Sequence, residues 1–521
     1  MYRISNIYVL AAFGTIGGAL FGFDISSMSA WIGTPQYLDY FNSPNSDLQG
    51  GITASMSAGS FAGALGAGYL SDIMGRKHAL LVASIIWIIG SVVTLSAQNV
   101  AHLVAGRVIN GLTVGVMSSQ VPVYLAELSP KNTRGRIVGI QQWAIEWGIL
   151  IMYMISYGCT FIDGPASFRT AWGIQAIPAL FLIGALFFFP ESPRWYASKD
   201  RWDEALDVLA LLHGNGDIHD PLVQAEFEEV REAQAIAALG SQLPILGLFG
   251  PTMWRRTVCG LFCQIWQQLL GGNVMMYYIV YVFNMAGLTG NVNLVSSSIQ
   301  YVIFLVTTAI TLLFIDRLGR RPLFLYGGIA MGILNFAVAG LMKTGGHRVE
   351  EVGGNANIKW RVHGSYATGV IACSYIFVAF YGLTWAPAAW VFISEIFPLQ
   401  WRAKGVGMSA AANWLFNFAL AYFVPPAFRN IQWRTYIIFG VFCFCGVVHS
   451  YLMFPETAGK TLEEIDYLFN NKIPAWKSSE VKSRLEERVD KFEHKGQAEH
   501  REAEVTHDVE KGNATATAQT R

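Results

Sequence analysis

The stretch Asp72-Ile73-Met74-Gly75-Arg76-Lys77 decides the fold, because it joins two apolar segments and returns later as Asp316-Arg317-Leu318-Gly319-Arg320-Arg321. Two further short patterns repeat in the same order. They are Glu127 with Arg134 and Glu395 with Arg402, then Pro190-Glu191-Ser192 and Pro455-Glu456-Thr457. Three repeats in one order indicate two homologous halves. Parallel six-helix halves with a binding site between them are a plan that transporters use.

The composition indicates a membrane protein. Of the 521 residues, 53% are hydrophobic and 14% are charged, whereas a soluble domain carries about 25% charged residues. The formal net charge is zero, which argues against a nucleic-acid-binding protein. About twelve apolar stretches are each long enough to span a bilayer. They lie near residues 7–28, 50–70, 79–97, 101–125, 138–159, 171–189, 257–281, 294–315, 322–342, 366–393, 405–424 and 434–454.

We therefore predict an all-α membrane protein with twelve transmembrane helices in two six-helix pseudo-repeats. The tail is charged and then ends in a polar run, which predicts disorder past about residue 478. The expected parts are an N-terminal half at 1–189, short cytoplasmic linker helices at 190–256, a C-terminal half at 257–454 and a cytoplasmic C-terminal tail at 455–521.

Lysine and arginine predict the orientation of the chain in the membrane. Loops that carry them alternate with neutral loops, so both termini are expected in the cytoplasm. Loop 343–365 carries four basic residues and breaks the alternation, but it is long, and loop length weakens the rule.

Two acids lie inside predicted spans. Asp24 belongs to the first apolar stretch, where a charge costs about 2.5–3.5 kcal/mol on insertion scales and usually marks an ion or proton path. The alternative is that Asp24 ends the span in headgroup water. Glu146 follows Gln142 by four residues, so the two side chains share a helix face. Glu146 is expected to assist proton transfer or to share Arg107, a basic residue of the fourth apolar stretch. The alternative is a hydrogen-bonded structural acid.

The repeated loop motifs place acids and arginines at helix ends. Such groups can pair across the two halves, hold one side of a transporter closed and release it in another state. The alternative is that they only set the topology. The predicted gating residues are Asp72, Arg76, Glu127, Arg134, Asp316, Arg320, Glu395 and Arg402.

The chain resembles the sugar porters of the major facilitator superfamily, most of all fungal hexose and pentose proton symporters. The resemblance covers about residues 5–470 and rests on five motifs in order. They are Gly68-Tyr-Leu-Ser-Asp72-Ile-Met-Gly75-Arg76-Lys77, Pro190-Glu-Ser-Pro-Arg194-Trp195, Gln267-Gln268-Leu-Leu-Gly271-Gly272-Asn273, Asp316-Arg-Leu-Gly-Arg320-Arg321 and Pro455-Glu-Thr-Ala-Gly459-Lys460.

The resemblance implies a sugar site in mid-membrane. Amides suit it because, like a sugar hydroxyl, they both donate and accept hydrogen bonds; for any one amide the alternative is a helix–helix hydrogen bond. A regular helix would not align Gln267 and Gln268 with Asn273, but a break at Gly271-Gly272 would help. The implied sugar contacts are Gln142, Gln267, Gln268, Asn273, Trp390, Asn413 and Trp414, with Phe21, Tyr277 and Tyr278 completing or gating the site.

Two positions carry further implications of the resemblance. Relatives commonly have Asn where Phe304 stands, and we hypothesise that Phe304 fills the space of a hexose hydroxymethyl group and favours xylose over glucose. The alternative is that Phe304 faces lipid. Proton symporters of the family have Asp at the position of Asp24, facilitators have Asn, and the expected partner of Asp24 is Arg107. Protonation of Asp24 would free Arg107 and let the helices shift.

The predicted function is proton-coupled transport of a monosaccharide of the glucose and xylose class by alternating access. A facilitative uniporter is the close alternative, and a transporter-like sugar sensor is a further one. The sequence lacks a His-rich metal cluster, a phosphate-binding loop and a nucleophile elbow, so we expect no enzyme, cofactor or metal. The expected partners are the sugar, a proton and the lipid bilayer. We expect a monomer in the plasma membrane.

Overall fold

The computed structural model of the chain describes residues 4–29, 31, 35–42, 44, 46–130, 132–238, 245–277, 279–288, 290–350, 352, 359–398 and 400–480. It is built almost wholly from helices. Its first half contains α1 (Ile7–Gly14), α2 (Ile16–Ser29), α3 (Pro35–Tyr40), α4 (Ser46–Met74), α5 (Arg76–Leu95), α6 (Val100–Leu128), α7 (Arg134–Cys159), α8 (Ala166–Ile174) and α9 (Ile177–Leu186).

The second half repeats this plan after a set of linker helices. The linker contains α10 (Pro193–Ser198), α11 (Trp202–His213), α12 (Pro221–Ala238) and the short 3-10 helix η1 (Ile245–Phe249). The second half contains α13 (Trp254–Leu269), α14 (Gly272–Tyr277), α15 (Ile279–Met285), α16 (Gly290–Leu318), α17 (Arg320–Gly345), α18 (Gly364–Leu383), α19 (Trp385–Glu395), α20 (Arg402–Asn430) and α21 (Arg434–Met453). The chain then forms α22 (Leu462–Asn470) and η2 (Ala475–Glu480), and residues beyond 480, where disorder is predicted, lie outside the described residues.

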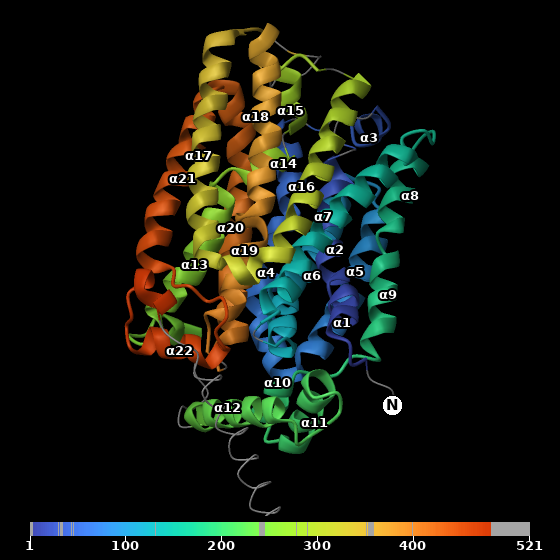
Figure 1. The fold of residues 1–521 in the computed structure, drawn as a ribbon. Coiled ribbons are helices and arrows are strands. Elements are labelled where there is room, and N and C mark those ends of the chain that lie inside the picture. Colours follow the sequence, from blue (N-terminus) through green and yellow to red (C-terminus); the bar gives the residue numbers. More distant parts are fainter. Residues whose placement is uncertain are drawn as a thin grey trace, which may run out of the picture.

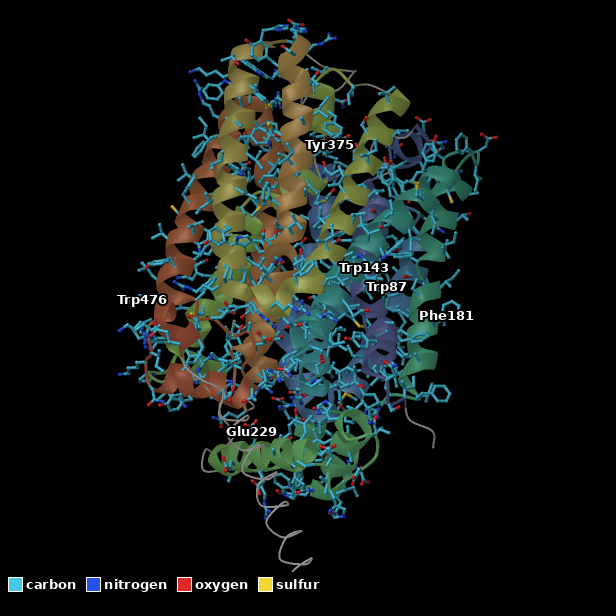
Figure 2. The ribbon with its side chains drawn as sticks, viewed as in Figure 1. Trp87, Trp143, Phe181, Glu229, Tyr375 and Trp476 are labelled. Atoms are coloured by element: carbon cyan, nitrogen blue, oxygen red, sulfur yellow. The ribbon has the colours of Figure 1, made fainter. Side chains whose placement is uncertain are left out.

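The helices stand roughly parallel in one tall bundle (Figure 1). Helices α10, α11 and α12 lie across one end of it, which we call the linker end. Over the described residues, nine helices are long and apolar enough to cross a membrane. Three further segments, which are more polar than these nine, complete the twelve-helix arrangement. They are α4, α13 to α15 and α20. Side chains such as Phe181, which is 65% exposed, point outward from the bundle, as a lipid-facing surface requires (Figure 2).

The two halves meet most extensively along two pairs of helices, with further contacts of α6 with α20 and of α7 with α19. Helix α4 packs against α20, and α7 packs against α16. Glycines permit the first approach, because a Cβ at Gly407 would stand 2.6 Å from the backbone oxygen of Ala64. Ser57 on α4 also donates a hydrogen bond of 2.8 Å to Oδ1 of Asn417 on α20.

Two spans of the second half are broken. Gly271 separates α13 from α14 and has φ +92°, a conformation that favours glycine, so the break falls at the predicted glycine pair. The second break separates α18 from α19 at Thr384. Pro387 has no N–H for the carbonyl of Leu383 four residues earlier, and the hydroxyl of Thr311 donates to that carbonyl instead, at 2.9 Å.

A short hairpin interrupts the helical pattern between α17 and α18. Strands β1 (Gly346–Arg348) and β2 (Trp360–Val362) pair antiparallel, with His347 opposite Arg361. The sequence analysis treats this region only as a long loop. The indole of Trp360 donates to the backbone oxygen of Met342 at 2.8 Å, which fastens the hairpin to the end of α17.

His213 fastens the linker helices to the end of α6. Its Nδ1 lies 2.5 Å from Oε2 of Glu226 on α12, and its Nε2 lies 2.9 Å from the backbone oxygen of Leu128. Both partners are acceptors, so a doubly protonated imidazole satisfies both contacts. Burial alone would lower the pKa of His213, but Glu226 and the two hydrogen bonds outweigh it and hold this pKa above its ordinary value of 6.5.

The raised pKa predicts how His213 contributes to stability. Its contribution is complete below about pH 6.5 and is lost as the pH rises through the raised pKa of the folded state. We expect His213→Ala to lower the free energy of unfolding by about 2 kcal/mol at acidic pH and by less at alkaline pH. Thermal unfolding of both proteins in detergent from pH 6 to pH 9 measures the difference. The exposed His219 provides the control, since His219→Ala should leave stability unchanged; a pH-independent difference for His213→Ala would contradict the prediction.

Candidate functional site

Buried amides from α13 and α20 meet inside the second half. The Nδ2 of Asn413 donates to Oε1 of Gln264 at 2.7 Å and to Oε1 of Gln267 at 2.9 Å. Its Oδ1 accepts from Nε2 of Gln268 at 2.8 Å. The structure thus brings together three of the implied sugar contacts and adds Gln264, which the sequence analysis does not select. A fully connected network of this kind fixes the direction of each amide.

Asn417 extends this network to the first half. It lies one turn after Asn413, its Nδ2 is 3.5 Å from Oε1 of Gln268, and its Oδ1 accepts from Ser57 on α4. Asn417, like Gln264, is not among the residues predicted from the sequence. The four-residue spacing from Asn413 was the available signal, because it places both amides on one face of α20.

Gln267 also holds the broken tenth span. Its Nε2 donates to the backbone oxygen of Ala386 at 3.1 Å and reaches that of Trp385 at 3.5 Å. These oxygens belong to the first turn of α19, directly after the break. The amide network and the break in the helix are therefore one connected structure.

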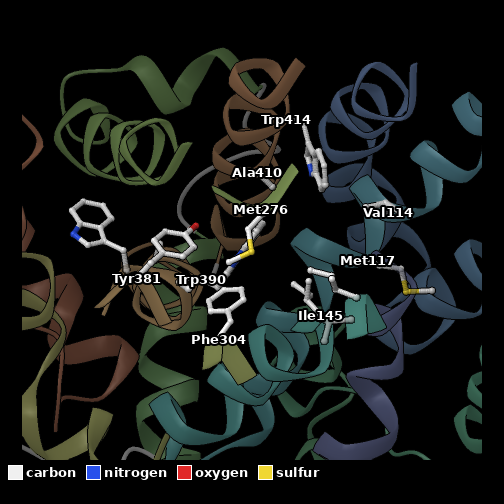
Figure 3. Packing of buried hydrophobic residues seen from close by; sticks show 14 of the residues in the cluster. Val114, Met117, Ile145, Met276, Phe304, Tyr381, Trp390, Ala410 and Trp414 are labelled. Carbon is white, nitrogen blue, oxygen red and sulfur yellow. The ribbon is translucent and has the colours of Figure 1, made fainter. Parts of the chain in front are cut away.

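The implied aromatic residues of the site come from both halves. Phe21 on α2 meets Trp414 on α20 edge to face, with ring centroids 4.7 Å apart, and the indole of Trp414 donates to Oγ of Ser118 at 3.1 Å. Trp390 on α19 is buried. Figure 3 shows Trp390 and Trp414 among apolar side chains contributed by both halves. Apolar faces of this kind suit the C–H faces of a sugar ring.

Phe304 is buried in the protein and does not face lipid. It is 3% exposed and stacks on Tyr381 of α18, with ring centroids 5.7 Å apart (Figure 3). A Cβ at Gly382 would lie 2.9 Å from Cδ2 of Phe304, so the ring fills the space beside α18 tightly. Tyr381 is a member of this site that the sequence analysis does not identify.

Gln142 and Glu146 meet on α7 and reach the second half. Oε1 of Glu146 accepts from Nε2 of Gln142 at 3.1 Å and from the hydroxyl of Thr308 on α16 at 2.8 Å. Glu146 therefore bridges the halves beside an implied sugar contact. Within the part of the chain that the structure describes, no ion pair joins Glu146 to Arg107.

Asp24 pairs with Arg107 in the interior of the first half. Oδ2 of Asp24 lies 3.4 Å from Nη2 of Arg107, and both side chains are buried. Helix α2 continues beyond Asp24 to Ser29, and the Asp24 side chain is 1% exposed, so the acid lies inside the helix bundle. Nε of Arg107 donates to the backbone oxygen of Ile52 at 3.0 Å, which attaches the pair to α4.

The repeated charges form two clusters at the linker end. In the first half, Arg76 donates two hydrogen bonds to the carboxylate of Glu127, at 3.0 and 3.1 Å. In the second, Arg320 contacts Glu395 at 2.8 Å and Asp316 at 3.0 Å.

Contacts from each cluster cross to the other half. Arg402 lies 3.6 Å from Glu127, and Lys404 lies 3.6 Å from Asp72. Asp316 accepts from the backbone N–H groups of Gly135 and Arg136, at 2.8 and 2.9 Å. Arg134 donates to the backbone oxygen of Lys460 at 3.2 Å. These contacts join the halves at the linker end.

Two acids of the repeated Pro-Glu motifs complete the clusters. Glu191 accepts from the backbone N–H groups of Arg76 and Lys77 at the start of α5, and Glu456 accepts from those of Arg320 and Arg321 at the start of α17. Carboxylates at helix N-termini are stabilised by the helix dipole. The repeated motif is visible in the sequence, but this role of its acids is not.

Three implied site residues are not placed. The side chains of Asn273 and Tyr277, and the whole of Tyr278, lie outside the described residues.

The architecture and the comparisons with known proteins define the class of protein, a membrane transporter of the major facilitator type and not an enzyme. The sequence profile described as "Sugar (and other) transporter" matches residues 10–469, and the chain belongs to that family. A high-affinity glucose transporter of Kluyveromyces lactis is 48% identical over 486 residues, which cover 92% of this chain and 87% of the relative.

Solved structures of the proton:xylose symporter XylE have the same fold. The structure of XylE bound to 6-bromo-6-deoxy-D-glucose aligns with a TM-score of 0.78 at 27% identity, covering 90% of this chain and 100% of that chain. The inward open structure of XylE from E. coli aligns with a TM-score of 0.64 at 27% identity, covering 89% of this chain and 99% of that chain.

Proposed function

We propose that this sugar transporter family member couples monosaccharide uptake to a proton by alternating access. The observation that carries the proposal is the buried Asp24–Arg107 pair, separated by 3.4 Å. A carboxylate inside a membrane protein is stabilised either by a cation or by a proton. Asp24 can therefore exchange between an ionised form paired with Arg107 and a protonated form that releases Arg107. Support also comes from the relatives, since one is named a glucose transporter and XylE a proton:xylose symporter.

In this mechanism the two halves rock about the sugar site. The sugar binds the amides of α13 and α20 and Gln142 of α7, while apolar rings cover its C–H faces. A proton on Asp24 releases Arg107 from its counter-ion and permits α2 and α6 to shift. The crossing contacts at the linker end, such as Glu127 with Arg402, hold that side closed until then.

The arginine-rich loops support an orientation with the linker end in the cytoplasm. Both chain termini would then lie on the cytoplasmic side. We place the transporter in the plasma membrane as a monomer, where an external proton gradient can drive uptake.

Uptake in a cell that lacks sugar transporters tests the proposal. Labelled glucose or xylose should accumulate above its external concentration, sugar addition should alkalinise an unbuffered medium, and a protonophore should abolish the accumulation. Uptake that equilibrates and ignores the protonophore would instead identify a facilitative uniporter.

Phe304 supports a finer proposal about which sugar is carried. Its buried ring cannot make the hydrogen bond of an amide and leaves little room for a hydroxymethyl group. We expect glucose to inhibit xylose uptake more strongly in Phe304→Asn than in the wild type. The glucose concentration that halves xylose uptake should fall about tenfold. Competition uptake of labelled xylose measures this change. Phe304→Leu, which stays apolar, should not reproduce it, and equal inhibition of the wild type and Phe304→Asn would contradict the proposal.

A further inference from the structure

Glu146 has one carboxyl oxygen that the described protein leaves without a partner. The side chain is 1% exposed, and Oε1 carries both of its hydrogen bonds, from Gln142 and Thr308. Oε2 is buried and has no hydrogen-bond partner among the described residues. A buried polar atom in this condition loses the free energy of its hydration, so a partner from outside the described residues would stabilise it.

The position of this oxygen points to the transported molecule. Gln142 lies one turn before Glu146 on α7, and Phe304 lies one turn before Thr308 on the facing helix α16. Glu146 therefore stands where the two halves meet, between an implied sugar contact and the residue that replaces the family's amide. We infer that Oε2 of Glu146 hydrogen-bonds a hydroxyl group of the sugar, and that Glu146 supplies from α7 the contact that Phe304 cannot supply from α16. This inference rests on the proposed function.

The surrounding hydrogen bonds allow Glu146 to act in either charge state. The hydroxyl of Thr308 has one proton and two acceptors within reach, Oε1 of Glu146 at 2.8 Å and the backbone oxygen of Gly382 at 3.3 Å. An ionised Glu146 accepts from Thr308. A protonated Glu146 can donate to it, and Thr308 then turns to Gly382. In both cases Oε2 stays free for the sugar, because Oε1 holds the carboxyl group in place.

This role differs from that of Asp24. Asp24 faces a guanidinium, whereas the contacts of Glu146 are an amide and a hydroxyl. Glu146 is thus a sugar-binding and specificity-determining residue. Its substitution should change which hydroxyl groups of the sugar matter, while the proton count per sugar stays the same.

Deoxy sugars test the assignment. Competition by glucose and by its 2-, 3-, 4- and 6-deoxy analogues is measured in the wild type, Glu146→Ala and Glu146→Gln. We expect one analogue to compete about tenfold more weakly than glucose in the wild type and equally well in Glu146→Ala, because both changes remove the same hydrogen bond. Glu146→Gln keeps an oxygen in place and should fall between the two.

The outcomes are separable. An unchanged analogue profile in both variants overturns the assignment. If the proton-to-sugar ratio also falls, Glu146 is a proton relay instead. If Glu146→Ala does not reach the membrane, Glu146→Gln decides alone. A wild-type chain that carries sugar without protons refutes the proposed function and not the Glu146 contact, whereas a chain that moves no sugar overturns both.

Discussion

Asp24→Asn is expected to abolish accumulation of sugar while leaving exchange of sugar across the membrane. The amide cannot bind and release a proton, so the variant loses the step that frees Arg107, its partner at 3.4 Å. One charge moved through 100 mV supplies about 2.3 kcal/mol, which sustains about a fiftyfold sugar gradient. The variant should lower that gradient to one. Steady-state accumulation of labelled sugar, with and without a protonophore, measures the loss.

Two measurements guard this interpretation. Asp39 is an exposed acid on α3, so Asp39→Asn should keep both accumulation and proton influx. Counterflow in Asp24→Asn cells preloaded with sugar shows whether the sugar site survives. Sustained accumulation in Asp24→Asn would place the coupling proton on another group.

Glu127→Gln should cause the largest loss of stability. The carboxylate is wholly buried and is the counter-ion of Arg76 and Arg402, which come from different halves. The neutral amide would leave two buried guanidinium groups short of negative charge. Removing one partner from a buried pair costs about 3–5 kcal/mol. Thermal unfolding of the purified protein in detergent measures the loss, and transport should fall with it because the linker end no longer closes firmly.

The matched control is a charge pair of similar chemistry in an exposed place. Glu204 pairs with Arg201 on the surface of the linker helices, where both side chains are well exposed. Exposed pairs contribute about 0–1 kcal/mol, so Glu204→Gln should scarcely change unfolding. Equal effects of the two substitutions would mean that the Glu127 cluster only sets topology, the alternative raised by its sequence pattern.

The sequence predicts those features whose causes are local or repeated. The glycine pair at Gly271 predicts the break in the seventh span because glycine accepts a positive φ that other residues avoid. The duplicated charge motifs predict clusters at helix ends, since helix termini and loops place them there. Asp24 as a buried acid follows from its apolar neighbours, but Arg107 as its partner came from the resemblance to sugar porters.

The contacts that escape prediction depend on how helices are rotated against one another. Gln264 and Asn417 are amides in two of the more polar helices, and nothing local shows that they face Asn413 and not another helix. Thr308 is an ordinary residue in its own helix and gains its importance only because α7 brings Glu146 beside it. The role of Tyr381 likewise depends on helix packing, since its stacking on Phe304 requires α16 and α18 to be adjacent.

The attachment of Gln267 to the first turn of α19 has a mechanical consequence. The amide nitrogen of Gln267 that would donate to a sugar hydroxyl donates here to the backbone oxygens of Ala386 and Trp385. These hydrogen bonds restrain the break in the tenth span. A sugar that accepted this hydrogen bond would leave the break in the tenth span with fewer restraints and more flexible. If Gln267 binds the sugar as proposed, we expect one side chain to link occupancy of the site with flexibility of the tenth span, so that the bound sugar itself makes this helix easier to bend.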